Sequence, residues 1–123
     1  MAIDGAWGVL YWGKEDLGIG AFIIERDGEL RGRDFGGIDY SGTAKEDKDG
    51  NITLDVKMSV PAGVNLVQGD MPMHIPFDRL FSKTFPPRFN SGEPYEIKSL
   101  GVGVVIKPVP SNSPVLKALG LIP

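Results

Sequence analysis

Residues 52–60 read Ile-Thr-Leu-Asp-Val-Lys-Met-Ser-Val, with an apolar side chain at every second position and a polar one between. Side chains of a β-strand alternate between two faces, so this pattern is typical of a strand with one dry and one wet face. In a helix the same apolar residues would be scattered around the cylinder. The stretch therefore predicts a strand that covers a core.

Further short strands are expected on both sides, because β-branched and aromatic runs alternate with glycine- and proline-rich turns. Asp27-Gly28 predicts a two-residue type I′ hairpin turn, in which both positions need a positive φ. Residues 78–92 are expected to be irregular, since Pro86-Pro87 excludes a continuous helix. The expected strands are residues 5–12, 18–26, 29–34, 39–45, 52–60, 71–77, 95–99 and 102–107, with 71–77 at an edge or bulged because of its prolines.

About eight short strands at intervals of roughly ten residues predict an all-β fold, a small antiparallel barrel that is closed or nearly closed. A two-layer sandwich is the competing arrangement. Glycines within strands, such as Gly8, Gly20 and Gly42, favour the barrel because tight curvature needs small residues. Residues 1–110 are expected to form the barrel domain, and residues 111–123 a C-terminal tail with a short helix that begins at Ser113-Pro114.

Composition narrows the function classes. A chain of 123 residues is long enough for one core, and it contains no cysteine, which excludes disulfides and thiolate metal sites. The net charge of −3 and dispersed Lys and Arg argue against direct nucleic-acid binding. The start of the chain lacks the basic and apolar regions of a signal peptide, and no apolar run is long enough to span a membrane. We expect a cytoplasmic protein without membrane contact.

No catalytic, metal or cofactor site can be identified from the residues. His74 is the single histidine and is expected on the surface, since one histidine without cysteine cannot make the usual zinc site. Asp55, Asp78 and Glu93 are carboxylates whose spacing brings no two together. The pairs Gly18/Gly20 and Gly101/Gly103 lack the third glycine and the helix of a phosphate-binding loop, so they are interpreted as strand glycines.

Two apolar features need a partner surface. Trp7 and Trp12 have opposite parity along the first strand, so one of them should face outward or lie past the strand end. The tail carries several apolar residues that must be buried, either as a plug in the barrel end or against a second protomer. These residues are Val115, Leu116, Leu119, Leu121 and Ile122.

Residues 32–56 carry a family resemblance. They read GRDFGGIDYSGTAKEDKDGNITLDV, a Gly-x-Asp segment before a Tyr-x-Gly strand, an acidic turn and an alternating strand. Together with Asp4-Gly5-x-Trp7 at the start, this resembles the GrlR-like proteins. The resemblance implies a lipocalin-like barrel, a tendency to homodimerise, and negative regulation by binding a transcriptional regulator through an acidic loop. The matching loop is Glu46-Asp47-Lys48-Asp49, in which Lys48 interrupts the acidic run.

Three hypotheses follow. The first is a non-enzymatic regulatory barrel that acts by protein contact, a homodimer with the loop of Glu46, Asp47, Lys48 and Asp49 as one binding surface. The second is a carrier or sensor of a small apolar, lipid-like molecule. Its cavity would be lined by Met58, Met73, Ile75 and Phe77. The third and weakest is an enzyme with a carboxylate or His74 in the cavity.

Overall fold

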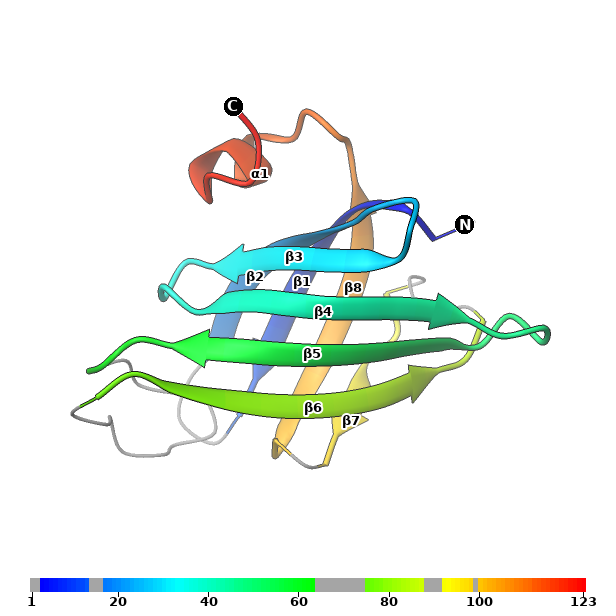
Figure 1. Cartoon of the computed structure of the whole chain (residues 1–123), viewed down its shortest axis with the longest axis horizontal. Helices are drawn as coiled ribbons and strands as arrows, with labels where there is room; N and C mark the ends of the chain where they lie inside the picture. The colour runs from blue at the N-terminus through cyan, green and yellow to red at the C-terminus, as the bar shows by residue number, and fades with distance from the viewer. Residues whose placement is uncertain (1–2, 14–16, 64–74, 88–91, 99) are drawn as a thin grey trace.

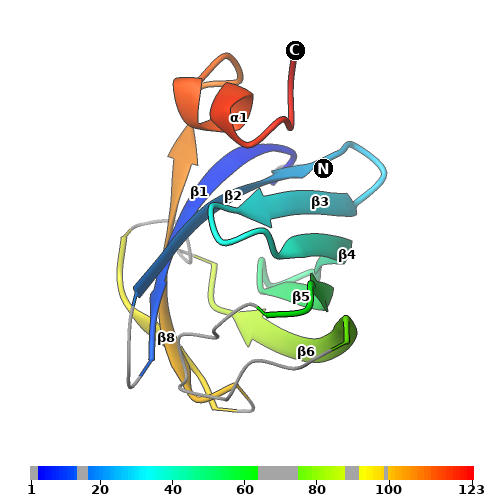
Figure 2. The same cartoon turned by 90° about the vertical axis from the view of Figure 1, so that its left-hand side faces the viewer.

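A single antiparallel sheet of eight strands is rolled into a nearly closed barrel, with one short helix outside it (Figures 1 and 2). The computed structural model describes residues 3–13, 17–63, 75–87, 92–98 and 100–123. The all-β prediction is confirmed, and the strands form a barrel and not a two-layer sandwich. The elements are β1 (Gly5–Trp12), β2 (Leu17–Ile24), β3 (Glu29–Asp34), β4 (Asp39–Glu46), β5 (Ile52–Val60), β6 (Phe77–Phe85), β7 (Tyr95–Ile97), β8 (Val102–Val109) and α1 (Pro114–Ala118).

The strands follow one another around the barrel in the order β6-β5-β4-β3-β2-β1-β8-β7. Strands β6 and β7 are therefore the two ends of the sheet, and side chains meet across the seam between them. Phe85 and Tyr95 pack edge to face there, with ring centroids 5.2 Å apart. Such a contact joins two sheet ends without backbone pairing.

The alternation in β5 faces inward as predicted. Ile52, Leu54, Val56, Met58 and Val60 are all buried, whereas Asp55 and Lys57 are exposed. The neighbouring strand β4 presents Tyr40, Gly42 and Ala44 on the same side, because these residues pair with Met58, Val56 and Leu54. The inward sides of the strands thus share one interior.

Three hairpin turns of the barrel have the same geometry. In each, the carbonyl of the first residue accepts the N–H of the fourth, and the N–H of the first donates to the carbonyl of the fifth. The fourth residue is a glycine with positive φ. This is a type I turn followed by a left-handed glycine, so the predicted type I′ turn at Asp27-Gly28 is wrong. Asp27 has a negative φ, since no described residue other than glycine has a positive one. The turns span residues 25–29, 34–38 and 47–51, with Gly28, Gly37 and Gly50 in the fourth position.

The prediction for residues 71–92 is wrong where the structure describes them. The strand begins at Phe77 instead of ending there, and it continues through the supposedly irregular residues to Phe85, just before Pro86. Ile75 lies outside the strand and is 66% exposed. The prediction failed because the inward side of this edge strand is not purely apolar. Arg79 and Lys83, which pair with Met58 and Leu54, interrupt the alternation of apolar residues. Residues 71–74 lie outside the described part of the chain.

The tail takes neither of the two expected positions. Leu116 and Leu119 of the α1 region are buried against Ala6 and Ala21, which lie on the outer side of β1 and β2. Arg33 also donates a hydrogen bond to the carbonyl of Leu119, at 3.0 Å. The helix thus covers the outside of the barrel wall (Figure 2), and it neither plugs the barrel end nor needs a second protomer to be buried.

The two tryptophans separate as their parity predicts. Trp7 is buried in the core and donates its indole N–H to the carbonyl of Ile3, at 3.2 Å. Trp12 ends β1 on the outer side, where it lies over Gly103 of β8. Gly101 is a turn residue with positive φ, so only its neighbour Gly103 is a strand glycine.

None of the helices in the described part of the chain is long and apolar enough to cross a membrane.

Candidate functional site

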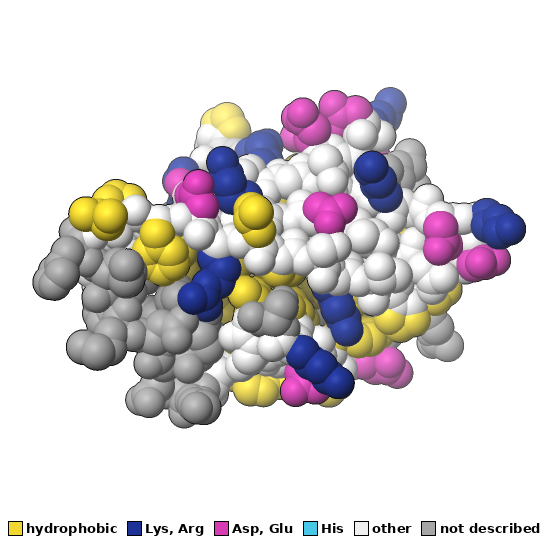
Figure 3. All heavy atoms as spheres, turned by 60° about the horizontal axis from the view of Figure 1, so that its bottom comes forward, with side chains coloured by type: hydrophobic (Ala, Val, Ile, Leu, Met, Phe, Trp, Pro, Cys, Tyr) yellow, Lys and Arg dark blue, Asp and Glu magenta, His cyan; other side chains and the backbone are white. Residues whose placement is uncertain are grey.

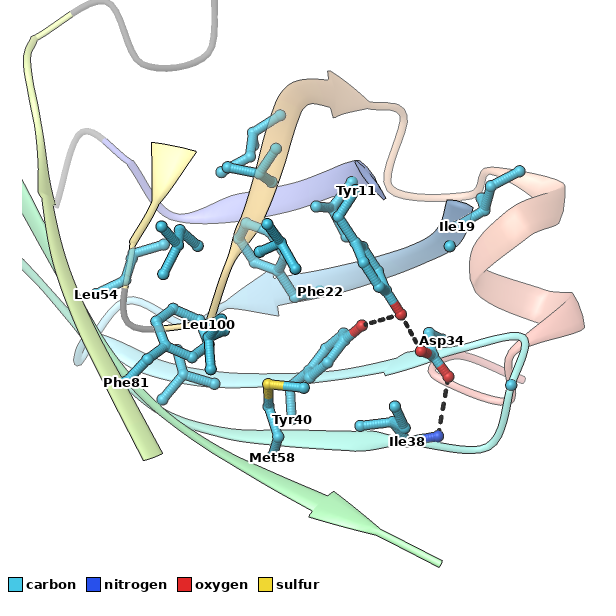
Figure 4. A pocket seen from close by; sticks show the side chains of 18 of the residues that line it. Tyr11, Ile19, Phe22, Asp34, Ile38, Tyr40, Leu54, Met58, Phe81 and Leu100 are labelled. Carbon is cyan, nitrogen blue, oxygen red and sulfur yellow. Dashed lines mark hydrogen bonds between the residues drawn. The ribbon is translucent and has the colours of Figure 1, made fainter. Parts of the chain in front are cut away.

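The barrel encloses a cavity of about 400 Å³. Its wall is built from residues of all eight strands and of the turns that precede β4 and β8 (Figure 4). Aliphatic and aromatic side chains make up nearly all of this wall. Among the described residues that line it, Asp34 is the single charged one.

A chain of three polar side chains lies at one end of the cavity (Figure 4). The Tyr40 hydroxyl donates to the Tyr11 hydroxyl at 3.1 Å, and Tyr11 donates to Oδ2 of Asp34. Oδ1 of Asp34 accepts the backbone N–H of Ile38 at 2.8 Å. Both carboxylate oxygens are therefore satisfied, although Asp34 is only 5% exposed.

Each member of this chain comes from a different strand, and glycines make room for it. Tyr11 pairs with Gly18, and a Cβ at Gly18 would overlap the Tyr11 ring. Asp34 pairs with Gly20, where a Cβ would come within 3.0 Å of the Asp34 Cβ. The Gly18-x-Gly20 pair is thus a strand feature as predicted, and it lets Tyr11 lie across β2 toward Asp34.

The environment keeps both phenols protonated. Burial raises the pKa of Tyr11 far above its ordinary value, and the hydrogen bond to Asp34 raises it further. Burial is also the main cause of the raised pKa of Tyr40, and the neighbouring Tyr11 and Asp34 raise it further by electrostatic repulsion. The two hydroxyls therefore act as hydrogen-bonding groups at neutral pH, and they are poor nucleophiles or bases there.

Positive charge lies at the barrel seam, on the inward side of β6. Arg79 and Lys83 of β6 lie on the inward side of that strand and are half-buried. Viewed from the side that Figure 3 brings forward, hydrophobic side chains are visible between those of Lys and Arg. Neither residue lines the cavity itself, so the charges border it and do not enter it.

The predicted cavity residues meet different outcomes. Met58 lines the cavity, as expected. Phe77 packs against the core beside it, but it is not part of the cavity wall. Ile75 is exposed, so its assignment to the wall is wrong. Met73 lies outside the described residues, as does His74.

The predicted partner-binding loop is a hairpin tip. It joins β4 to β5, and Glu46, Asp47, Lys48 and Asp49 are all exposed. Asp47 holds the turn together, because its Oδ1 accepts the N–H of Asp49 at 2.8 Å and that of Asn51 at 3.0 Å. The hydrogen bond from the Asn51 amide is the main reason that the pKa of Asp47 is lowered.

A second exposed surface contains Trp12, the outward tryptophan that the parity of the first strand predicts, together with apolar neighbours that were not predicted. Leu10 and Trp12 of β1 pair with Ile19 and Leu17 of β2. All four are exposed on the outer side of the sheet, and Leu17 and Ile19 also line part of the cavity. Leu17 and Ile19 are 55% and 51% exposed. These four residues, called the outer patch below, continue the same side of the sheet that α1 covers further along.

The described residues contain no metal site, and none of the proteins compared with the chain matches it, so neither observation indicates a function. The described residues include no group of His, Asp or Glu that could hold a metal ion. Comparison with protein-family models, with curated proteins and with solved structures gives no match.

The site residues Tyr11, Asp34 and Tyr40 were missed by sequence reasoning. Asp34 and Tyr40 flank one hairpin turn, but Tyr11 is 23 and 29 positions away from them, and only the strand register brings it to them. A usable signal was present in Gly18 and Gly20, because two glycines on one side of a strand leave space that large side chains from neighbouring strands can fill.

Proposed function

We propose that this protein binds a small, largely apolar molecule inside its barrel and serves as a carrier or sensor, without catalysing a reaction. The observation that carries the proposal is the cavity of about 400 Å³ with one polar cluster at its end. Ligand sites have volumes of roughly 300–1,000 Å³, apolar walls and few polar groups that fix orientation. An eight-stranded barrel is just wide enough either to be filled by side chains or to hold one small ligand.

The wall supports reversible binding more than chemistry. Its described polar groups are one carboxylate, already satisfied by two donors, and two phenols that stay protonated. Met58 contributes a flexible thioether, which suits ligands of varied shape. Binding would draw on burial of apolar ligand surface, at about 25 cal/mol per Å².

A probe that fluoresces in apolar surroundings, N-phenyl-1-naphthylamine, tests the proposal. We expect saturable fluorescence with the wild type and its loss in Val104→Phe, since Val104 is buried and lines the cavity. Val105→Phe is the matched control, because the adjacent residue of β8 faces the other side of the sheet. Equal probe binding by both variants would exclude the cavity as the site.

A second function, regulation by protein contact, is favoured by the outer patch of Leu10, Trp12, Leu17 and Ile19. Exposed apolar clusters of this kind are typical of interaction surfaces, and a homodimer through this patch agrees with the GrlR-like resemblance. Sedimentation of wild type and Ile19→Lys tests it, with Lys57→Glu on the exposed side of β5 as the control. A monomeric wild type would remove the homodimer from the proposal.

The acidic loop can bind a basic transcriptional regulator only through the residues that do not build the turn. Glu46 and Asp49 meet this condition, whereas Asp47 is engaged by its own backbone. Glu46→Lys with Asp49→Lys is therefore the informative variant, and unchanged partner binding would exclude the loop. The GrlR-like regulatory role and a cytoplasmic location stay predictions.

A further inference from the structure

The hydrogen bonds at the cavity end all run in one direction. Ile38 and Tyr11 donate to the Asp34 carboxylate, and Tyr40 donates to Tyr11. The Tyr11 proton is committed to Asp34, so the Tyr40 proton is the one that can lie between the two phenol oxygens, which are 3.1 Å apart. Turning the Tyr40 proton toward a ligand would leave two oxygen lone pairs facing each other.

The end of this chain is therefore an acceptor. Among the described residues, no donor reaches the Tyr40 oxygen, whose remaining lone pair is open to a ligand. Behind it lies a buried carboxylate, with no cationic side chain among the described residues of the wall. A ligand group that only accepts hydrogen bonds would meet an acceptor here, which costs the desolvation of both groups.

We propose that the Tyr40–Tyr11–Asp34 chain makes the cavity selective for apolar molecules that carry a hydrogen-bond donor, such as a hydroxyl, over acceptor-only molecules of the same size. This inference rests on the proposed function, since it names the chemical class of ligand for the same cavity. It also separates long-chain alcohols from fatty-acid anions, because a carboxylate would approach the Asp34 charge and find the Tyr40 and Tyr11 protons already engaged.

The positive charges of Arg79 and Lys83 at the seam would favour a different class of ligand, one with an anionic head group. Arg79 lies two strands from Tyr40 in the same cross-strand row, with Met58 between them. Lys83 lies further along β6, beside Leu54. If these cations set the ligand class, an anionic head group at the seam would be preferred to a hydroxyl at Tyr40.

A matched ligand pair tests the selectivity. Decan-1-ol and methyl nonyl ether have the same heavy atoms, but the ether has no donor. We expect decan-1-ol to displace N-phenyl-1-naphthylamine at a concentration about three- to tenfold lower than the ether, as for one net hydrogen bond. Equal concentrations would overturn the selectivity while leaving the proposed cavity function intact. Failure of the wild type to bind the probe would overturn both.

The direction of the chain is tested by Asp34→Asn. The amide oxygen keeps the Ile38 hydrogen bond, so the amide nitrogen faces Tyr11 and donates to it. Tyr11 can then donate to the Tyr40 oxygen, so the Tyr40 proton is free to point toward the cavity. The ether should therefore gain affinity until the preference approaches unity. Asp47→Asn is the control, because Asp47 has the same turn position but faces water. An unchanged preference in Asp34→Asn would overturn the mechanism.

Decanoate distinguishes the two ends of the site. We expect it to displace the probe less effectively than decan-1-ol at neutral pH. Stronger displacement by decanoate that is lost in Arg79→Met or Lys83→Met would overturn the proposal and assign the head group to the seam.

Discussion

Asp34 and Asp47 hold the same position in two hairpin turns, but their second carboxylate oxygens face opposite environments. Each opens a five-residue turn, and each accepts the N–H of the fifth residue on Oδ1, from Ile38 at 2.8 Å and Asn51 at 3.0 Å. Oδ2 of Asp47 accepts the exposed Asn51 amide at 3.1 Å. Oδ2 of Asp34 accepts the Tyr11 hydroxyl inside the barrel. One turn motif thus serves as an ordinary hairpin tip and as the base of the cavity.

This difference predicts unequal effects of truncation. Asp34→Ala leaves the buried Tyr11 hydroxyl and the Ile38 N–H without acceptors, so we expect the free energy of unfolding to fall by about 2–4 kcal/mol. Asp47→Ala removes hydrogen bonds that water can replace, so its loss should be clearly smaller. Urea denaturation of both variants measures this, and equal losses would contradict the buried role of Asp34.

The two cavity phenols predict an alkaline limit of stability. Burial raises the pKa of Tyr11 and Tyr40 in the folded state above the ordinary value near 10 of the unfolded chain. A group of this kind contributes stability that is fully present below the unfolded pKa and is lost as pH rises toward the folded one. We therefore expect the free energy of unfolding to fall above about pH 10.

Phenolate absorbance provides the measurement for this limit. The absorbance of Tyr11 and Tyr40 should rise together with the loss of folded signal in circular dichroism. Tyr40→Phe should be less sensitive to pH in the same range. Phenolate formation by both residues near pH 10 in a folded protein would contradict their buried environment.

The sequence predicted the strands where one period dominates a segment. In β5, polar and apolar side chains alternate without interruption, and burial follows them residue by residue. In β6, Arg79 and Lys83 occupy inward positions of an edge strand, so local hydrophobicity gave no period and the strand was missed. Inward charges of this kind are a common protection of sheet edges.

The polar chain of the cavity could not be derived in the same way. Tyr11 and Asp34 are brought together by their pairing with Gly18 and Gly20 of β2, which is a property of register and not of local pattern. Hairpin turns set that register, and the predicted type of the Asp27-Gly28 turn, which joins β2 to β3, is wrong. An error of one residue in the pairing of β2 with β3 would place Asp34 on the outside.

Gly18 is predicted to be essential to the cavity. A Cβ at this position would overlap the Tyr11 ring, so Gly18→Val should displace Tyr11 from Asp34 and narrow the cavity. We expect at least tenfold weaker probe binding, because the ring must move into the ligand space. Gly8→Ala is the control, since its Cβ would meet the Val109 side chain at 3.3 Å and the Lys107 carbonyl oxygen at 3.9 Å, both outside the cavity wall. Normal probe binding by Gly18→Val would show that Tyr11 has room elsewhere.

Truncation of the buried side of helix α1 is expected to lower the stability of the protein without weakening probe binding. Leu116 is fully buried, and its contacts are with the outer side of β1 and β2, not with the cavity wall. Leu116→Ala should lower the free energy of unfolding by about 2–4 kcal/mol, as for a buried leucine that leaves a void. Its probe affinity at 25 °C should equal that of the wild type, because the inward side chains keep their positions.

The opposite pattern is expected for Val104→Phe, which blocks the cavity and leaves the tail in place. Unfolding in urea and probe titration, carried out on both variants, therefore separate the two sides of the same barrel wall. If Leu116→Ala weakened probe binding in proportion to its loss of stability, the helix would be coupled to the cavity through β1 and β2. The outer and inner sides of these strands could then no longer be treated as independent.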